Sequence, residues 1–175
     1  MIRVAYILVF LILGSWNPSY GQTEEEDRQQ RFQKYVLYKV NQLRTEGCRC
    51  GRKRMKATHA LTWNETLAYS AYLHAEEMDR YDYFAHKSID GKDIGQRLDK
   101  IGYKWQYVGE NLAVGQDTFE EAFQDWIDSP SHCKMLMNPD MKEMGLSKYG
   151  EYWVHHFGTQ MPNGTRRVRT YYKEG

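Results

Sequence analysis

Residues 143–160, EMGLSKYGEYWVHHFGTQ, change the character of the chain near its C-terminal end. Aromatic and branched residues fill both halves of this stretch, and a Tyr-Gly-Glu turn at 149–151 separates them. This pattern is typical of two strands joined as a hairpin. The stretch VGENLAVG at 108–115 predicts a further strand, and the polar residues 161–175 predict a tail or a last edge strand. The sequence therefore predicts a small, mostly antiparallel sheet.

Helical patterns precede the strands. The stretch LTWNETLAYSAYLHAEEMDR at 61–80 repeats its apolar residues at helical spacing, and either Thr62 or Asn64 is suited to cap it. A shorter helix is expected at 91–103, where a glycine near the end stops it.

A third helix is expected at 117–129, where Thr118 and Glu121 have the spacing of a capping box and Pro130 ends the helix. An apolar stripe that begins at Phe32 predicts one more helix. Helices combined with a small sheet indicate an α+β domain, with helices on both faces of the sheet.

The first 21 residues have the features of a secretory signal peptide. Arg3 precedes an apolar run at 4–13 that is too short to span a bilayer comfortably, and small and polar residues follow it. We therefore expect a secreted, extracellular or periplasmic protein with no membrane span in the mature chain. Residues 22–33 are predicted to be a polar N-terminal segment, and residues 22–30 within it are expected to form a frayed start.

The charge balance argues against a nucleic-acid-binding protein. Removal of residues 1–21 takes away one basic residue and leaves 23 basic and 23 acidic residues. Phosphate binding needs a net basic face, and the basic stretch at 48–56 is short enough to be a solvated loop.

Three cysteines are present, at positions 48, 50 and 133. Export implies an oxidising compartment in which a disulfide persists. Cys48 and Cys50 are too near in sequence for an unstrained bridge. We expect Cys133 to pair with Cys48 or Cys50, which leaves one free thiol.

Three titratable residues lie in apolar surroundings near turns or element ends, namely His86, Glu110 and His132. Two imidazoles and a carboxylate suit Zn²⁺ or a similar divalent cation, with an open position for water. Their spacing is not that of a helical metal motif, so only the fold can bring them together. The alternative is that the histidines and Glu110 are structural groups with backbone partners. The aromatic run at 81–84 is expected to pack behind His86.

Several short motifs together resemble a known family. FAHKSIDG, GY, GENLAVG, a Trp, SPSHCKMLMNP, MGL and YWVHHFG occur in this order over residues 34–160. This series resembles the CAP superfamily, the SCP-like proteins that include the cysteine-rich secretory, antigen 5 and pathogenesis-related proteins. It is most similar to the bacterial branch, whose pattern also has an Arg before the GY pair.

The resemblance implies a three-layer α-β-α sandwich with a large cleft. Many members line this cleft with two histidines and two acidic residues, and in some members these residues bind a divalent cation. His86, Glu110 and His132 match three of the four by position. Asp128, close after a Trp, is a candidate for the fourth. Another is one of the adjacent strand histidines His155 and His156, which point to opposite faces so that only one can face the cleft; we name His155.

Three functions remain open at this level. We favour a secreted, non-catalytic binding module whose His/Glu cleft holds a divalent cation and whose ligand is a lipid, glycan or protein. A second interpretation is a metal-assisted hydrolase or peptidase with Glu110 as general base. A third is a structural domain braced by its disulfide. A serine hydrolase is disfavoured because the sequence has no G-x-S-x-G elbow.

Overall fold

The computed structural model describes residues 19–162 and 170–171. The chain divides into two compact units, Met1–Phe32 and Gln33–Gly175, and the second unit contains the sheet. Most of the predicted signal peptide therefore lies outside the described residues.

The elements in chain order are α1 (Ser19–Glu46), β1 (Cys48–Cys50), β2 (Lys53–Met55), β3 (Thr62–Trp63), α2 (Glu65–Tyr81), α3 (Ile94–Lys100), β4 (Trp105–Val114), α4 (Phe119–Asp128), α5 (Pro130–Leu136), β5 (Glu143–Tyr149), β6 (Tyr152–Gln160) and β7 (Thr170–Tyr171).

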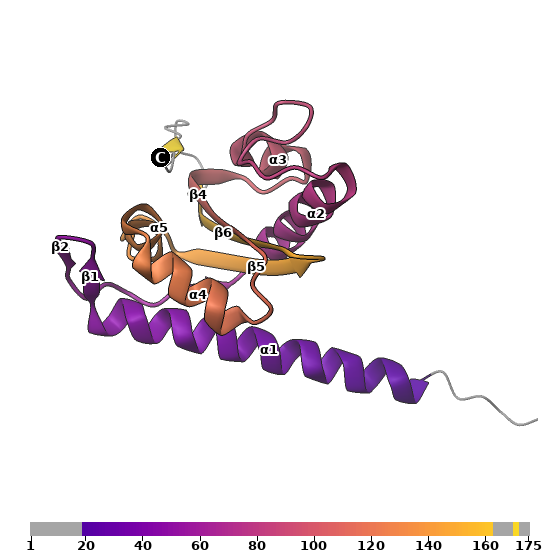
Figure 1. Ribbon diagram of the computed structural model, residues 1–175, viewed down its shortest axis with the longest axis horizontal. Coiled ribbons are helices and arrows are strands. Elements are labelled where there is room, and N and C mark those ends of the chain that lie inside the picture. Colours follow the sequence, from indigo (N-terminus) through magenta and orange to yellow (C-terminus); the bar gives the residue numbers. More distant parts are fainter. Residues whose placement is uncertain (1–18, 163–169, 172–175) are drawn as a thin grey trace, which may run out of the picture. The chain divides into compact units, whose positions relative to one another are not determined.

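A five-stranded sheet with the order β3-β5-β6-β4-β7 forms the middle layer. The two central pairings, β5 with β6 and β6 with β4, are antiparallel. The short edge strands β3 and β7 pair in parallel. Helices α2 and α3 lie on one side of this sheet, and α4 and α5 lie on the other (Figure 1). The predicted α-β-α sandwich with a mostly antiparallel sheet is confirmed.

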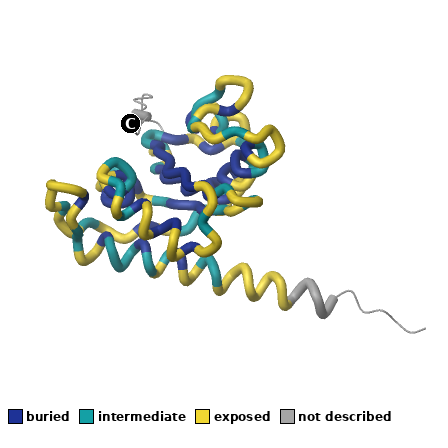
Figure 2. The backbone as a smooth tube through the Cα atoms, in the orientation of Figure 1, coloured by how far each residue is buried: buried dark blue, intermediate teal, exposed yellow. Residues whose placement is uncertain are grey.

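The β6 strand separates two cores because its residues alternate between the two faces of the sheet. Val154 packs with the buried face of α2. Trp153 and His155 point the other way, where they meet aromatic rings of α4. The buried residues lie along the sheet and on the helix faces that are turned toward the sheet (Figure 2).

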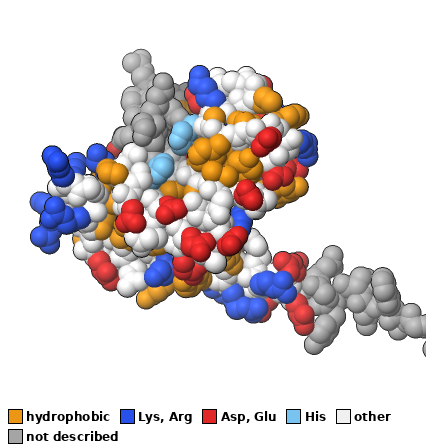
Figure 3. Space-filling model, viewed as in Figure 1, with side chains coloured by type: hydrophobic (Ala, Val, Ile, Leu, Met, Phe, Trp, Pro, Cys, Tyr) orange, Lys and Arg blue, Asp and Glu red, His pale blue; other side chains and the backbone are white. Residues whose placement is uncertain are grey.

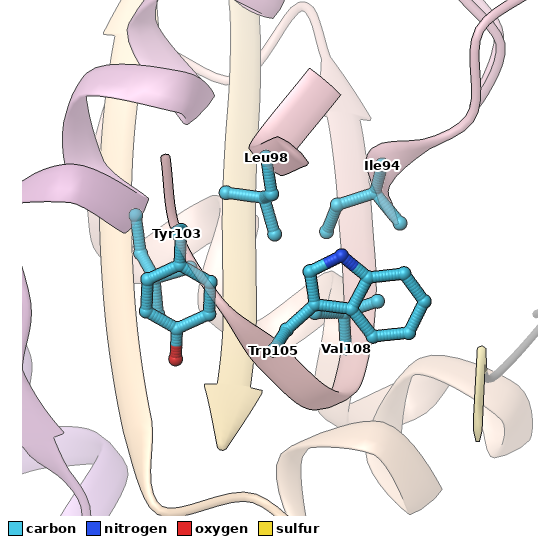
Figure 4. Close-up of a cluster of buried hydrophobic side chains, with 6 residues drawn as sticks. Ile94, Leu98, Tyr103, Trp105 and Val108 are labelled. Atoms are coloured by element: carbon cyan, nitrogen blue, oxygen red, sulfur yellow. The ribbon is translucent and has the colours of Figure 1, made fainter. Parts of the chain in front are cut away.

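The α3 helix is held to β4 by a separate apolar cluster (Figure 4). Trp105 packs beside Ile94 and Val108, and its indole N–H donates to the carbonyl of Gly95 at 3.1 Å. The lack of a side chain at Gly95 lets this indole approach the helix backbone. The cluster fixes the position of α3, which carries one residue of the candidate site.

Helix capping follows the sequence closely. Of the two candidates for the start of α2, Asn64 is the cap, and its side chain accepts from the backbone N–H groups of Thr66 and Leu67. Thr118 and Glu121 form the predicted capping box of α4. These local hydrogen bonds satisfy amide groups that a helix start leaves free.

Two local expectations were wrong, and a third was confirmed but incomplete. Residues 22–30 are helical rather than frayed, because Glu, Gln and Arg are good helix formers and ion pairs such as Arg28–Glu25 (3.1 Å) support the helix. The loop at 48–56 contains the β1–β2 hairpin. Pro130 ends α4 but also begins α5, since proline is well suited to the first position of a helix.

Buried Arg44 ties the C-terminal half of α1 to the segment after α5. Its guanidinium donates to the carbonyls of Leu136 (2.6 Å) and Asn138 (3.1 Å) and to that of His59 (3.0 Å). Burial lowers the pKa of Arg44 to about 10, so the side chain stays charged at neutral pH. Arg44 thus supplies donors to carbonyl groups that α5 and the following loop leave unpaired.

Candidate functional site

Glu110 is the centre of a buried polar cluster on the α2 and α3 side of the sheet. Its side chain is 1% exposed. One carboxylate oxygen lies 2.8 Å from Nδ1 of His86. The other accepts from the guanidinium of Arg97 at 2.5 Å and lies 2.6 Å from Nε2 of His156. Both oxygens of this carboxylate are therefore occupied by protein groups.

These partners keep Glu110 ionised. Burial by itself raises the pKa of a carboxyl group, but the charge of Arg97 and the hydrogen bonds from His156 and His86 more than offset it. The pKa of Glu110 consequently lies well below its ordinary value. A buried carboxylate paired in this way is a hydrogen-bond acceptor that holds its neighbours in place.

Four separate elements bring the cluster together. Glu110 on β4 and His156 on β6 are direct partners in the antiparallel ladder, so they share one face of the sheet. Arg97 comes from α3 and His86 from the loop after α2. Arg97 also donates to the backbone carbonyl of His86 at 2.9 Å, which fixes this loop against the carboxylate.

The ionised carboxylate sets the tautomer of His86. Because Glu110 only accepts, His86 donates from Nδ1–H, and in the neutral ring this leaves the lone pair on Nε2. The side chain of His86 is 32% exposed, so the ring has access to solvent. A carboxylate behind a histidine in this way orients the ring for a cation at the opposite nitrogen.

His132 approaches from α5. Its ring is half-buried, and its backbone carbonyl accepts from the side chain of Asn111 at 3.1 Å. Burial and the neighbouring His86 lower the pKa of His132, so the ring is neutral at pH 7.

The two candidates for the fourth ligand, Asp128 and His155, do not contact Glu110. Asp128 is exposed at the end of α4, where its carboxylate accepts from Gln124 at 3.0 Å. His155 lies on the opposite face of the sheet, with its ring centre 4.0 Å from that of Phe157 and 5.4 Å from that of Trp126. His156, rather than His155, contacts Glu110, because alternate residues of β6 face opposite sides.

Within the described ranges, one group of three metal-ligating side chains has its ligand atoms within 4.8 Å of one another, and it consists of Cys48, Cys50 and Cys133. The histidine and carboxylate candidates do not form such a group. Cys133 is bonded to Cys50, which decides between the two expected pairings, and Cys48 is the free thiol.

The aromatic run at 81–84 does not pack behind His86 as expected. Tyr83 turns inward, where its hydroxyl donates to Glu77 at 2.6 Å and its ring lies against His74. Phe84 is 50% exposed, and its ring centre lies 6.4 Å from that of Tyr152. On the face of the molecule drawn in Figure 3, hydrophobic side chains gather beside histidine side chains.

One residue of the cluster, Arg97, was not proposed from the sequence, and His156 was proposed only as an alternative to His155. Arg97 had one available signal, the Arg that precedes the GY pair in the bacterial pattern. His156 was recognised only as one of two adjacent strand histidines. The choice between them needed the register of β4 against β6.

Comparison with known proteins now adds to this geometry. The family model described as "Cysteine-rich secretory protein family", CAP, matches residues 37–157. This chain belongs to the CAP family. Its CAP domain is 31% identical over 96 residues to the uncharacterized protein YkwD of Bacillus subtilis, covering 54% of this chain and 37% of that protein. It is 30% identical over 97 residues to the uncharacterized membrane protein YlbC of the same organism, covering 55% and 28% respectively. The chain thus spans about a third of the length of these curated relatives.

Solved structures support the CAP fold. An extracellular protein with an SCP domain from Bacillus anthracis is 28% identical, with a TM-score of 0.57 over 59% of this chain and 35% of that chain. An outer surface protein of Borrelia burgdorferi has a TM-score of 0.63 at 22% identity, over 74% of this chain and 92% of that chain. Among the described residues of this CAP domain, no helix combines the length and apolarity needed to cross a membrane.

Proposed function

We propose that this CAP domain is an extracellular binding module that holds a divalent cation between His86 and His132 and does not hydrolyse its ligand. The observation that carries the proposal is the contact of both Glu110 carboxylate oxygens with protein groups, one oxygen with His86 and the other with Arg97 and His156. The extracellular setting is supported by the relatives, one described as extracellular and one as an outer surface protein.

The environment of Glu110 disfavours the alternative of a metal-assisted hydrolase. A general base needs a pKa near the working pH and a lone pair that can reach a water. The pKa of Glu110 is far below that range, and both of its oxygens already accept from protein groups. Glu110 instead positions His86, which is the role of a carboxylate behind a metal-binding imidazole.

The donor set fits a divalent cation of the Zn²⁺ class. His86 has its Nε2 lone pair available in the neutral ring, and burial lowers the pKa of His132, which keeps that ring neutral at pH 7. Neutral imidazoles are common zinc ligands, and a bound ion would polarise a polar group of the ligand at this position. With two protein ligands, such a site is weaker than a structural zinc site and leaves coordination positions for water or ligand.

The exposed face beside His86 supplies apolar contact area for a ligand. Phe84 and Tyr152 present neighbouring rings there. Aromatic rings contribute large contact areas to binding sites, and a few polar groups orient the ligand. Lipid, glycan and protein ligands all match this combination, so the proposal stays at the level of a binding module.

The test is a calorimetric titration of the oxidised protein with Zn²⁺. We expect binding of one ion per chain, lost in a His86→Ala/His132→Ala double variant and retained in His59→Ala, a histidine outside the cluster. Oxidised protein is used because the Cys50–Cys133 disulfide then removes two thiols as competing ligands. Equal binding by the double variant and the wild type would refute the cation site.

The non-catalytic part of the proposal needs its own measurement. The zinc-loaded protein is incubated with peptide, ester and glycan substrates, with and without a chelator. We expect no chelator-sensitive turnover. Turnover that the chelator removes and that His132→Ala lowers would establish the hydrolase instead.

A further inference from the structure

Three sulfur atoms meet where the β1–β2 hairpin contacts α5. Cys50 and Cys133 are joined as a disulfide across a sequence separation of 83 residues. The free thiol of Cys48 lies beside them, with its Sγ 3.6 Å from that of Cys133 and 3.8 Å from that of Cys50. This arrangement lies outside the Glu110 cluster and has no part in the function proposed above.

The position of Cys48 does not suit attack on the disulfide. A thiolate displaces one sulfur of a disulfide along the axis of the S–S bond. Cys48 is almost equally distant from both bonded sulfurs, so it lies at the side of the bond rather than on its axis. The geometry therefore favours another use of the third sulfur.

The distances match those of thiolates around one metal ion. With metal–sulfur bonds of about 2.3 Å, tetrahedral or trigonal ligands lie roughly 3.8–4.0 Å apart. Two of the three sulfur–sulfur separations are already close to this range. We propose that Cys48, Cys50 and Cys133 form a redox-gated site that, once the disulfide is reduced, binds a thiolate-preferring d¹⁰ cation such as Cu⁺ or Zn²⁺.

The surroundings fit such an ion. Three thiolates and a divalent cation leave a net negative charge, and more with Cu⁺. Arg49, Arg54 and Lys56 line the same surface pocket of about 740 Å³ as Cys48, so positive charges lie close and the ion has a route in. Met55 and Met137 belong to the same cluster of side chains as the cysteines, and thioether-rich surroundings are typical of soft cations.

The site opens when an external dithiol reduces the Cys50–Cys133 disulfide. The dithiol gives two electrons and two protons to the Cys50–Cys133 bond and leaves as its own disulfide. The cation then displaces the thiol protons of the three cysteines into solvent as the metal–sulfur bonds form. In the oxidised state only Cys48 keeps a thiol, and the site is closed.

The experiment measures metal binding to full-length protein reduced with a dithiol and separated from it without oxygen. Zn²⁺ and Cu⁺ are titrated in separate arms against a chromophoric chelator for each ion. Reduced wild type is compared with reduced Cys48→Ala, which also lacks the disulfide but has two thiols. We expect one tightly bound ion per chain in at least one arm, in addition to any weaker Zn²⁺ binding at His86 and His132. This ion should bind about 100-fold more tightly to the wild type than to Cys48→Ala. The arm with tighter binding identifies the cation.

Two controls make the result decisive. Oxidised wild type must not bind at this affinity, and reduced His86→Ala/His132→Ala must bind the tightly held ion like the reduced wild type. In that histidine double variant, the bound ion must also raise the midpoint of thermal unfolding of the reduced protein, and the further change Cys48→Ala must remove this rise, which shows that the folded chain holds the ion. Equal affinities for reduced wild type and Cys48→Ala, loss of binding in the histidine double variant, or no rise in the midpoint would overturn the proposal.

Discussion

The carboxylate of Glu110 shows how one buried residue organises its neighbours. Arg97 and His156 share one of its oxygens, and His86 takes the other. These groups come from four elements, so the ionised carboxylate acts as a common acceptor that links them. The consequence for function is orientation of His86 rather than proton transfer.

Replacement of Glu110 by Gln tests this linking role. The change leaves Arg97 buried without its counter-charge, and the loss of one partner of a buried ion pair costs about 3 kcal/mol or more. We expect the free energy of unfolding, measured in urea, to fall by this amount. Glu151→Gln, at an exposed position, is the matched control and should leave it nearly unchanged. A change of less than about 1 kcal/mol for Glu110→Gln would contradict the linking role.

His155 is the opposite case, a buried imidazole without a hydrogen-bond partner for either ring nitrogen in the described part of the chain. Burial lowers its pKa well below the ordinary value, and the nearby His156 and Arg44 lower it further. Its ring packs against Phe157 and Trp126 as an apolar side chain would. The ring therefore contributes packing and carries a desolvation cost.

We expect His155→Phe to stabilise the fold by about 1 kcal/mol at pH 7, because no hydrogen bond is lost. The wild type also loses stability as the pH falls below about 6.5, since His155 gains a proton only in the unfolded chain. The free energy of unfolding of His155→Phe should fall less steeply with pH than that of the wild type. The difference between the two slopes should be about 1.4 kcal/mol per pH unit between pH 6 and 5. Urea unfolding at pH 7, 6 and 5 measures both effects, and identical pH slopes would refute the explanation.

At the level of elements, α2 lies unusually close to β5. A side-chain carbon at Gly145 would overlap the backbone of α2 at Leu67 and Ala68. The hydroxyl of Ser147 also donates to the carbonyl of Ala68 at 2.8 Å. The glycine is thus needed for the contact of helix and sheet, which places the loop with His86 at the end of α2.

Gly145→Ala should therefore destabilise the fold by about 3 kcal/mol or more, since backbone atoms cannot move aside as a flexible side chain does. Gly102→Ala is a useful comparison. At Gly102 a methyl group meets open space, and only its positive φ of 83° opposes the change. That variant should lose about 1–2 kcal/mol. Thermal or urea unfolding ranks the two, and an equal loss would show that packing at Gly145 is not the cause.

At the level of the whole molecule, the Cys50–Cys133 disulfide joins the β1–β2 hairpin to α5, far apart in sequence. Closing so long a loop limits the unfolded chain and contributes about 4 kcal/mol in the chain-entropy account. We expect Cys133→Ala to lose most of this amount in urea unfolding. Cys48→Ala keeps the disulfide and should change stability by about 1 kcal/mol or less. A similar loss in both variants would indicate that packing of the sulfurs, rather than the bridge, is the stabilising factor.

The sequence by itself determined the local elements and the family. Thr118 and Glu121 cap α4 through hydrogen bonds to nearby amides, so a short stretch was sufficient to predict them, and for α2 the sequence narrowed the cap to Thr62 or Asn64. The β5–β6 hairpin likewise depends on a turn and on alternating side chains between neighbours in the chain. The ordered CAP motifs also identified His86 and Glu110, which the fold places in contact.

Only the tertiary structure decided which groups complete the cluster. Arg97, His156 and the pairing of Cys50 with Cys133 depend on contacts between elements that are distant in the sequence. A shift of one residue in the register of β4 against β6 would exchange His155 for His156, and no local pattern fixes that register. The physical reason is that helix and turn preferences act over a few residues, whereas strand register and helix packing are set by the whole folded chain.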